Sequence, residues 1–298
     1  MRPLTLTLTL TLLLPLTSAH GVVTLIKGAN GVDMPGLSVA DGTPRDCSSN
    51  RCGSQADTAI IRDREMRSGD VGPLGRTQGN GPVDAATMVA NFMGGAAAPT
   101  NSGANSSVGV EDAIGGGVAA AAGNKKGAVV AARQLLKGLF GGGGTESAVA
   151  TEENVRATAG AGAGSGLPTC GDDGSIEMVF HQINQDGAGP LQAAVDGTSG
   201  GTEAAAFKTA EVTQDVPGVG FQGLSLATNK DFPLTVQMPA GMTCEGTVAG
   251  VENVCVVRVR NGAAAGPFGG SAAFTQSPAA RKRAIEYRLR RRAEAFSA

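Results

Sequence analysis

The 298-residue sequence contains two histidines, His20 and His181, and both stand where a metal site could form. His20 follows a segment with the features of a secretory signal peptide: a basic residue near the start, an apolar stretch over residues 4–16, and small residues up to Ala19. Cleavage after Ala19 would make His20 the first residue of the mature chain. Its α-amine and imidazole could then bind one metal ion, and the imidazole of His181 would supply a third nitrogen.

Three nitrogens in this T-shaped arrangement, a histidine brace, are suited to Cu(II), which favours tetragonal nitrogen ligation and heads the divalent affinity order. We therefore predict one copper ion with His20 and His181 as ligands. Because the α-amine has an ordinary pKa of about 8 and binds metal only when deprotonated, copper affinity should fall as the pH falls. The alternative is that His20 is an incidental terminal residue and His181 an ordinary surface histidine.

The elements expected to position these histidines are β-strands. Residues 21–27 have strand character directly after His20, and residues 175–183 alternate in the same way around His181. A polar segment follows His181. This histidine is therefore expected at the junction of a strand and a loop, where binding residues are often found.

Turn residues separate the remaining strand candidates, and no long helix lies between them. This pattern predicts an all-β fold, an immunoglobulin-like antiparallel β-sandwich with short helices at 57–66 and 84–93. The predicted strands span residues 21–27, 175–183, 206–212, 233–238, 254–260 and 270–276.

Glycine accounts for 46 residues, and many of them lie in a Gly/Ala-rich segment at 94–168. Such a segment buries too little apolar surface to offset chain entropy, so we expect a largely disordered insertion. Residues 128–140 within it have helical spacing, and this helix could be transient or could contact a membrane or a partner. The predicted organisation is a signal peptide at 1–19, one domain at 20–280 interrupted by the insertion, and a basic tail at 281–298.

The tail differs in charge from the rest of the chain. Residues 281–298 contain seven Lys or Arg and two Glu, a net charge of +5, whereas residues 20–280 carry −8. The tail could bind an acidic surface such as a polysaccharide or a membrane. Alternatively, a protease could remove it at Lys282-Arg283, or it could be a solvated terminal helix.

Composition disfavours two classes of protein. The sequence has no Trp and one Tyr, and the domain is not basic, so the aromatic platforms and positive surface of a nucleic-acid-binding protein are missing. After the signal peptide, no segment approaches the ~18 apolar residues of a membrane-spanning helix. We therefore expect a secreted, extracellular protein without a transmembrane segment.

The five cysteines are an odd number, and secretion permits disulfides. Sequence does not settle their pairing, although the short local loops favour Cys47–Cys52 and Cys244–Cys255, with Cys170 left over. The competing assignment, a zinc site, lacks any CxxC pair.

Six short motifs occur in order along the chain: HGVV at 20–23, PGLSV at 35–39, DGTPRDC at 41–47, IIRD at 60–63, HQINQDGAGP at 181–190 and GPFGG at 266–270. Together they bracket most of residues 20–276, and in them the sequence resembles the appressorium-associated Egh/Mas/Gas-type virulence factors of pathogenic fungi. The insertion and the basic tail lie outside the resemblance. It implies a secreted fungal protein made during host penetration.

The predicted brace is similar to that of lytic polysaccharide monooxygenases, which are copper enzymes on immunoglobulin-like sandwiches. This similarity implies an aromatic residue at the axial position of the copper, for which Phe274 is the candidate, with Gln276 behind it. Two functions follow as alternatives. The protein is either a copper-dependent oxidase acting on a cell-wall or cuticle polysaccharide, or a non-catalytic secreted copper-binding or surface-associated virulence factor. The body lacks the Tyr and Trp that usually grip crystalline cellulose, which disfavours that substrate.

Overall fold

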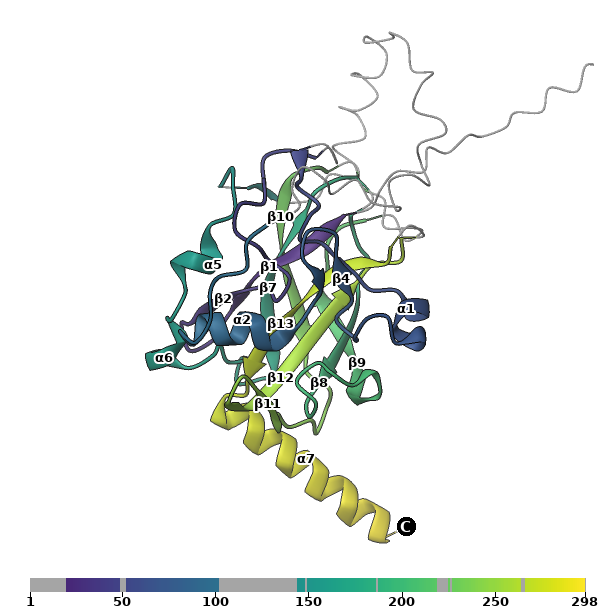
Figure 1. Cartoon of the computed structure of the whole chain (residues 1–298). Coiled ribbons are helices and arrows are strands. Elements are labelled where there is room, and N and C mark those ends of the chain that lie inside the picture. Colours follow the sequence, from purple (N-terminus) through teal and green to yellow (C-terminus); the bar gives the residue numbers. More distant parts are fainter. Residues whose placement is uncertain are drawn as a thin grey trace, which may run out of the picture.

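Most of the regular secondary structure in this computed structural model is antiparallel β-strand (Figure 1). The structure describes residues 20–48, 52–101, 144–147, 149–185, 187–218, 225, 227–263 and 266–297. The predicted signal peptide at 1–19 and the predicted helix at 128–140 lie outside the described residues.

The described strands are β1 (Gly21–Lys27), β2 (Asp33–Pro35), β3 (Ala59–Ile60), β4 (Arg76–Thr77), β5 (Gly81–Pro82), β6 (Thr145–Glu146), β7 (Ser175–Gln182), β8 (Gln192–Asp196), β9 (Phe207–Gln214), β10 (Lys230–Gln237), β11 (Gly246–Val248), β12 (Val251–Arg260) and β13 (Phe268–Thr275). The α-helices are α1 (Asp63–Ser68), α2 (Ala85–Phe92), α5 (Asn154–Ala157), α6 (Gly162–Ser165) and α7 (Pro278–Ser297), and a 3-10 turn covers Ala204–Ala206.

The strands follow one hydrogen-bonded path in the order β2-β1-β7-β10-β9-β8-β12-β13-β3-β4-β5, with β11 beside β12 and β6 beside β10. Every strand pair in the path is antiparallel, and β9 joins the two halves. The sheet folds over so that β1 approaches β13. At this contact Gly270 has no side chain, and a Cβ there would lie 2.7 Å from the backbone nitrogen of Val23. The predicted all-β antiparallel fold with short helices is confirmed.

The alternation of β7 accounts for its place in the fold. Ile176, Met178 and Phe180 are buried, whereas Glu177 between them is exposed. Residues with this period of two must lie on a sheet with one face against the core. The core between the two halves is built largely from such apolar strand residues.

The predicted helix at 57–66 is wrong at its start. Residues 59–60 form β3, and α1 begins at Asp63. Asp57, which was expected at the helix start, instead faces the buried guanidinium of Arg45. The second predicted helix is close to α2, where the Asp84 carboxylate accepts a hydrogen bond from the Ala86 N–H, as an N-cap does.

The described part of the Gly/Ala-rich segment includes residues that pack on the domain. Val155 of α5 and Leu167 are buried in the main core, and Glu152 is 2% exposed. Four of the last residues before the β7 region, at 162–165, form α6. Composition alone therefore placed the end of the predicted insertion too late, because a few buried residues anchor this glycine-rich chain.

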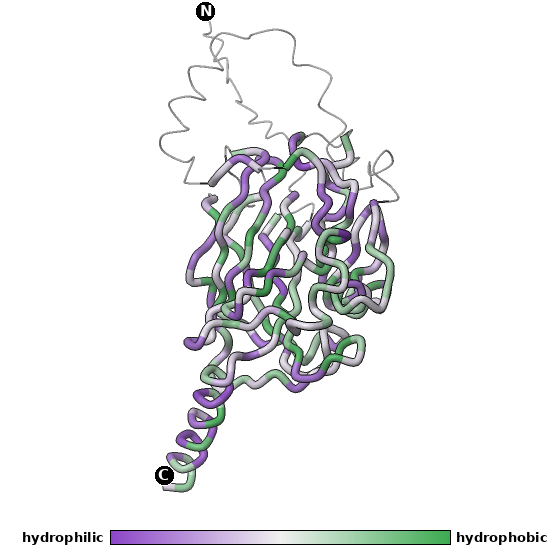
Figure 2. The backbone as a smooth tube through the Cα atoms, turned by 90° about the vertical axis from the view of Figure 1, so that its left-hand side faces the viewer, coloured by the Kyte–Doolittle hydropathy of each residue, from purple (hydrophilic) through white to green (hydrophobic). Residues whose placement is uncertain are grey.

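The basic tail is helical, as predicted, and forms α7. In two views at right angles the helix runs away from the sheets, and the chain ends at its far tip (Figures 1 and 2). Its first turns contact the body through Ala280 and Ala284, which are buried. None of the helices in the described part of the chain is both long and apolar enough to span a membrane.

Candidate metal site at the ends of β1 and β7

The register of β1 and β7 brings the two histidines to one face of the sheet. Gly21 pairs with Gln182 and Val22 with His181, and the N–H of Ile183 donates to the His20 carbonyl at 3.0 Å. Directly opposed residues point to the same side, so His20 and His181 share a face as diagonal neighbours. Diagonal positions on paired strands are roughly 7–8 Å apart, within reach of long side chains.

His181 is oriented as histidine ligands of metals usually are. Its Nδ1 lies 2.7 Å from a carboxylate oxygen of Asp231, the residue paired with it on β10. Because a carboxylate only accepts, Nδ1 carries the proton of this hydrogen bond, and in the neutral imidazole Nε2 then has the lone pair. Among the described residues no hydrogen-bond partner faces Nε2, which is buried. A carboxylate behind one nitrogen and an unsatisfied lone pair on the other is the arrangement of a metal-binding histidine.

His20 presents its backbone nitrogen and its ring to the same neighbour. The backbone N–H donates to the side-chain oxygen of Asn184 at 2.7 Å, and the Asn184 amide nitrogen lies 3.5 Å from Nδ1. The two nitrogens that would chelate an ion therefore lie on one side of His20. The ring also packs against Phe268, with centroids 4.2 Å apart and planes tilted by 37°.

Glycines let the chain approach His20 closely. A Cβ on Gly187 would overlap with the His20 carbonyl, and a Cβ on Gly21 would overlap with the ring of Phe180. Gly187 lies in the loop after β7, and the backbone N–H of Gly187 donates to the Asn184 carbonyl. The HGVV and HQINQDGAGP motifs thus meet at this site, and their glycines are needed for close packing.

The two histidines are the residues on which the predicted copper site depends. Within the described segments, no three His, Cys, Asp or Glu residues are arranged to hold a metal ion. A brace needs two imidazoles and an α-amine, and the pair His20 and His181 would provide this set if residues 1–19 were removed. Both imidazoles are buried, and both are neutral nitrogen donors when they bind a metal.

The structure places Phe274 and Gln276 far from the two histidines. Phe268, at the first position of β13, is the aromatic residue beside His20, and Phe274 lies six positions further, about 20 Å along an extended strand. Phe274 is instead opposite Cys255 in the core. The expectation that Phe274 lies at the axial position of a metal at His20 is therefore not met by this arrangement.

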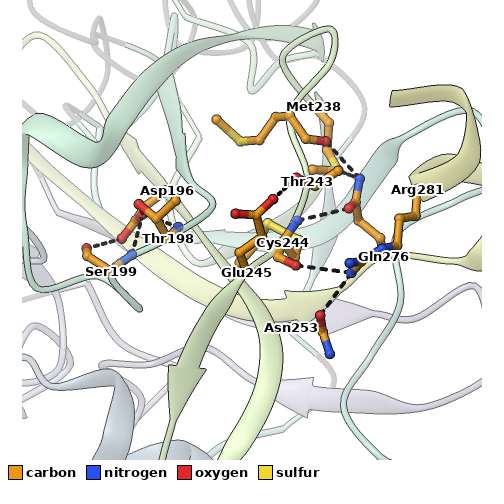
Figure 3. Close-up of a disulfide and its surroundings, with 12 residues drawn as sticks. Asp196, Thr198, Ser199, Met238, Thr243, Cys244, Glu245, Asn253, Gln276 and Arg281 are labelled. Carbon is orange, nitrogen blue, oxygen red and sulfur yellow. Dashed lines mark hydrogen bonds between the residues drawn. A yellow bond between two sulfur atoms is a disulfide. The ribbon is translucent and has the colours of Figure 1, made fainter. Parts of the chain in front are cut away.

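Gln276 lies beside the disulfide of Cys244, where its side chain bonds neighbouring backbone groups (Figure 3). Its side-chain oxygen accepts from the Cys244 N–H at 2.9 Å, and its amide nitrogen donates to the Met242 carbonyl at 3.0 Å. Cys244 is bonded to Cys255, and Cys47 to Cys52, whereas Cys170 is free and buried. The pairing favoured by the short loops is confirmed.

Three residues at the site were not predicted from sequence. Asn184 and Phe268 lie inside the HQINQDGAGP and GPFGG motifs, so motif membership could have pointed to them. Asp231 lies in no quoted motif, and only the pairing of β10 with β7 brings it to His181. Sequence spacing carries no signal for that contact.

The DGTPRDC motif forms a buried ion cluster apart from the histidines. The Arg45 guanidinium bonds both carboxylate oxygens of Asp57, at 3.0 and 2.5 Å, and its Nε donates to Glu152 at 3.0 Å. All three side chains are at most 2% exposed. Burial alone would lower the pKa of Arg45, but the two carboxylates outweigh it and hold the pKa above its ordinary value. This cluster, termed the Arg45 clamp below, ties residues 41–57 to the chain before α5.

A family model described as Egh16-like virulence factor matches residues 18–269. The chain belongs to this family. It is 55% identical over 275 residues to the appressoria-specific virulence factor GAS2 of Pyricularia oryzae, which covers 92% of this chain and 89% of the relative. It is also 39% identical over 132 residues to the appressoria-specific virulence factor GAS1 of Pyricularia oryzae, covering 43% of this chain and 51% of that protein. No solved structure matches the chain.

The extent of the family match divides the structure. It includes both histidines, Asp231, Phe268 and the Arg45 clamp, and it ends before Phe274, Gln276 and α7. The histidine pair is therefore part of the region that this member shares with the Egh16-like family model, whereas the basic helix lies outside that region.

Proposed function

We propose that this Egh16-like protein is a secreted fungal virulence factor that acts during host penetration and whose mature domain binds one copper ion through His20 and His181. The virulence role and its setting are supported by membership of the family and by relatives that are named appressoria-specific virulence factors. Secretion is supported by the signal-like sequence at 1–19 and by two disulfides. The copper site rests on one observation above all, the buried Nε2 of His181 with the Asp231 carboxylate behind Nδ1.

Bound copper would supply a redox-active ion in a nitrogen site. The chain's own residues would hold it. Asp231 would fix the ring of His181 so that Nε2 faces the ion, and Asn184 would lie beside the α-amine and Nδ1 of His20. Phe268 would form an apolar wall against the His20 ring.

The structure favours non-catalytic copper binding over oxidation of a polysaccharide. Both histidines are 0% exposed in the chain that still carries residues 1–19, and a polymer could not approach an ion held there in that form. Cleavage of a cell-wall or cuticle polysaccharide is the second candidate, carried by the similarity of the residue set to a histidine brace. It requires that removal of residues 1–19 opens the site.

The test is to prepare the chain beginning at His20 and to titrate it with Cu(II) by calorimetry, following the nitrogen ligation by electron paramagnetic resonance. A matched control carries one additional alanine before His20, which leaves both imidazoles in place but converts the α-amine to an amide. We expect tight binding of one ion, at least tenfold weaker binding in the extended control, and loss of the tight site in His181→Ala. Absence of a tight site in the authentic chain would overturn the copper proposal.

A second measurement separates the two candidates. The copper-loaded chain is incubated with plant cell-wall and cuticle preparations, a reductant and oxygen, and soluble oxidised oligosaccharides are sought by mass spectrometry. Release that depends on His181 would establish oxidation, and tight copper binding without such products would establish the non-catalytic function.

A further inference from the structure

The C-terminal helix α7 is mostly detached from the domain, and its sequence is unlike that of the rest. Its 20 residues extend about 30 Å. In Figures 1 and 2 all but the first turns lie away from the sheets. Packing on the core therefore accounts for only the beginning of this helix.

The side of α7 that contacts the body is defined by residues four apart. Ala280 and Ala284 are buried, and Arg288 one turn later donates to the Thr243 hydroxyl at 3.1 Å. Arg281 also bonds the body, donating to the Asn253 side chain at 2.9 Å and lying 3.4 Å from the Cys244 carbonyl (Figure 3). These contacts fix the rotation of the helix about its axis.

A different side carries an apolar stripe. Ile285, Leu289 and Phe296 are separated by four and seven residues, which places them within about 40° of one another around the helix. They are 40%, 59% and 93% exposed. The stripe lies roughly a third of a turn from the body-facing side, so the domain does not cover it.

Basic residues border this stripe. At 100° per residue, Arg292 projects on one side of it and Lys282 on the other. Arg281 and Arg288 lie on the same side as Arg292 but are bonded to the body. The helix carries seven basic and two acidic residues, a net +5, next to a body of net charge −8. An exposed apolar strip between cations on one helix is the pattern of an interfacial helix that lies in the plane of a membrane.

We propose that the outer side of α7 binds an anionic lipid bilayer. Ile285, Leu289 and Phe296 enter the boundary between headgroups and acyl chains, while Arg292 and Lys282 beside them contact lipid phosphates. The acidic body is repelled from the same surface, so the helix is the part that touches it. This inference is independent of copper binding.

Two other occupants fit the residues of this helix less well. An acidic polysaccharide would attract the arginines but would not bury Phe296, which is 93% exposed, or Leu289 on the same stripe. A second copy of the chain offers an acidic body to the helix, and its binding would appear as a change of oligomeric state. Both are outcomes of the experiment below.

The experiment measures co-sedimentation of the full chain beginning at His20 with two kinds of vesicle, phosphatidylcholine alone and phosphatidylcholine mixed with phosphatidylserine. The first variant replaces the stripe (Ile285→Ser, Leu289→Ser, Phe296→Ser), and its control places three serines at the alanines Ala279, Ala293 and Ala295. The second variant removes the two cations that border the stripe (Lys282→Gln, Arg292→Gln). Circular dichroism reports whether the helix persists in each.

We expect binding to the phosphatidylserine vesicles only, at least tenfold weaker binding for the stripe variant, near-native binding for its alanine-to-serine control, and about a thirtyfold loss for the cation variant. No binding of the native chain, or native binding by a helical stripe variant, would overturn the proposal. Retention of the stripe variant on a sulfated polysaccharide column, together with unaltered vesicle binding, would assign the helix to polyanions. Concentration-dependent dimerisation that is lost in the stripe variant, without vesicle binding, would assign it to a second copy.

Discussion

Replacing Arg45 by methionine is expected to destabilise the domain more than replacing any exposed arginine. The substitution retains an unbranched side chain of similar length but leaves Asp57 and Glu152 without their cation in a site that is at most 2% exposed. Breaking a buried ion pair by removing one partner costs about 3–5 kcal/mol, because the remaining charge is neither solvated nor paired. Here two carboxylates are left, so the cost should be near the upper end.

The expected loss can be read as a melting temperature. For a domain of this size each kcal/mol corresponds to roughly 2–4 °C, so about 5 kcal/mol lowers the midpoint by about 10–20 °C. The assay is thermal and urea unfolding at neutral pH, followed by far-ultraviolet circular dichroism. The matched control is Arg156→Met, because Arg156 pairs with Glu153 on the surface, with both side chains about 60% exposed. Such exposed pairs contribute about 0–1 kcal/mol.

A further variant tests the electrostatic reason directly. Adding Asp57→Asn and Glu152→Gln should recover part of the loss, since no uncompensated charge then remains. The reasoning is refuted if Arg45→Met is no less stable than Arg156→Met. If Arg45→Met does not fold, Arg45→Lys, which keeps the charge but not the fork of donors, supplies the comparison.

Three other outcomes follow from the contacts described. Asp231→Asn should weaken copper binding tenfold to a hundredfold, because the ring of His181 loses the carboxylate that orients it. The measurement is calorimetry on the chain beginning at His20, and equal copper affinity in the two chains would contradict the prediction. Gly187→Ala should cost about 1–3 kcal/mol in urea unfolding, since its Cβ overlaps with the His20 carbonyl, and unchanged stability would show that the loop moves freely. Burial alone would raise the pKa of Asp196, but hydrogen bonds from the Ser199 hydroxyl and from backbone N–H groups outweigh it and lower the pKa. A carboxyl group whose pKa is lower in the folded than in the unfolded protein stabilises the fold above the unfolded pKa of about 4. That contribution is lost as the pH falls through the folded pKa. The loss of unfolding free energy in Asp196→Asn should therefore be largest at neutral pH and should diminish in acid.

The six longest of the thirteen described strands could be predicted from local pattern, because a strand with one face in the core needs apolar residues at every second position. β7 is the clearest example, with Ile176, Met178 and Phe180 buried along it. The same rule could not locate β2 to β6, which are two or three residues long and too short to show a period. Their positions depend on tertiary contacts.

The helix predicted to begin at Asp57 shows the limit of local signals. An aspartate before a polar stretch resembles an N-cap, but a buried arginine distant by 12 residues binds its carboxylate instead. Glu152, from a segment expected to be disordered, completes the cluster. A long-range ion pair of this kind leaves no local pattern in the sequence. Helix propensity therefore gave the wrong helix start at Asp57, and composition gave the wrong expectation of disorder at Glu152.

The sequence was sufficient to name His20 and His181 as candidate ligands, because a chain with two histidines and a predicted cleavage site before one of them offers few other ligand sets. It was also sufficient for the antiparallel class and for both disulfides. The surroundings of the pair depended on the fold. Asp231 reaches His181 only because β10 lies beside β7, and Phe268 rather than Phe274 lies against His20 because β13 presents its first residue at that end of the sheet. Residue types are written along the chain, whereas the register between strands is set by the packing of the whole core, and that register decides which side chains meet.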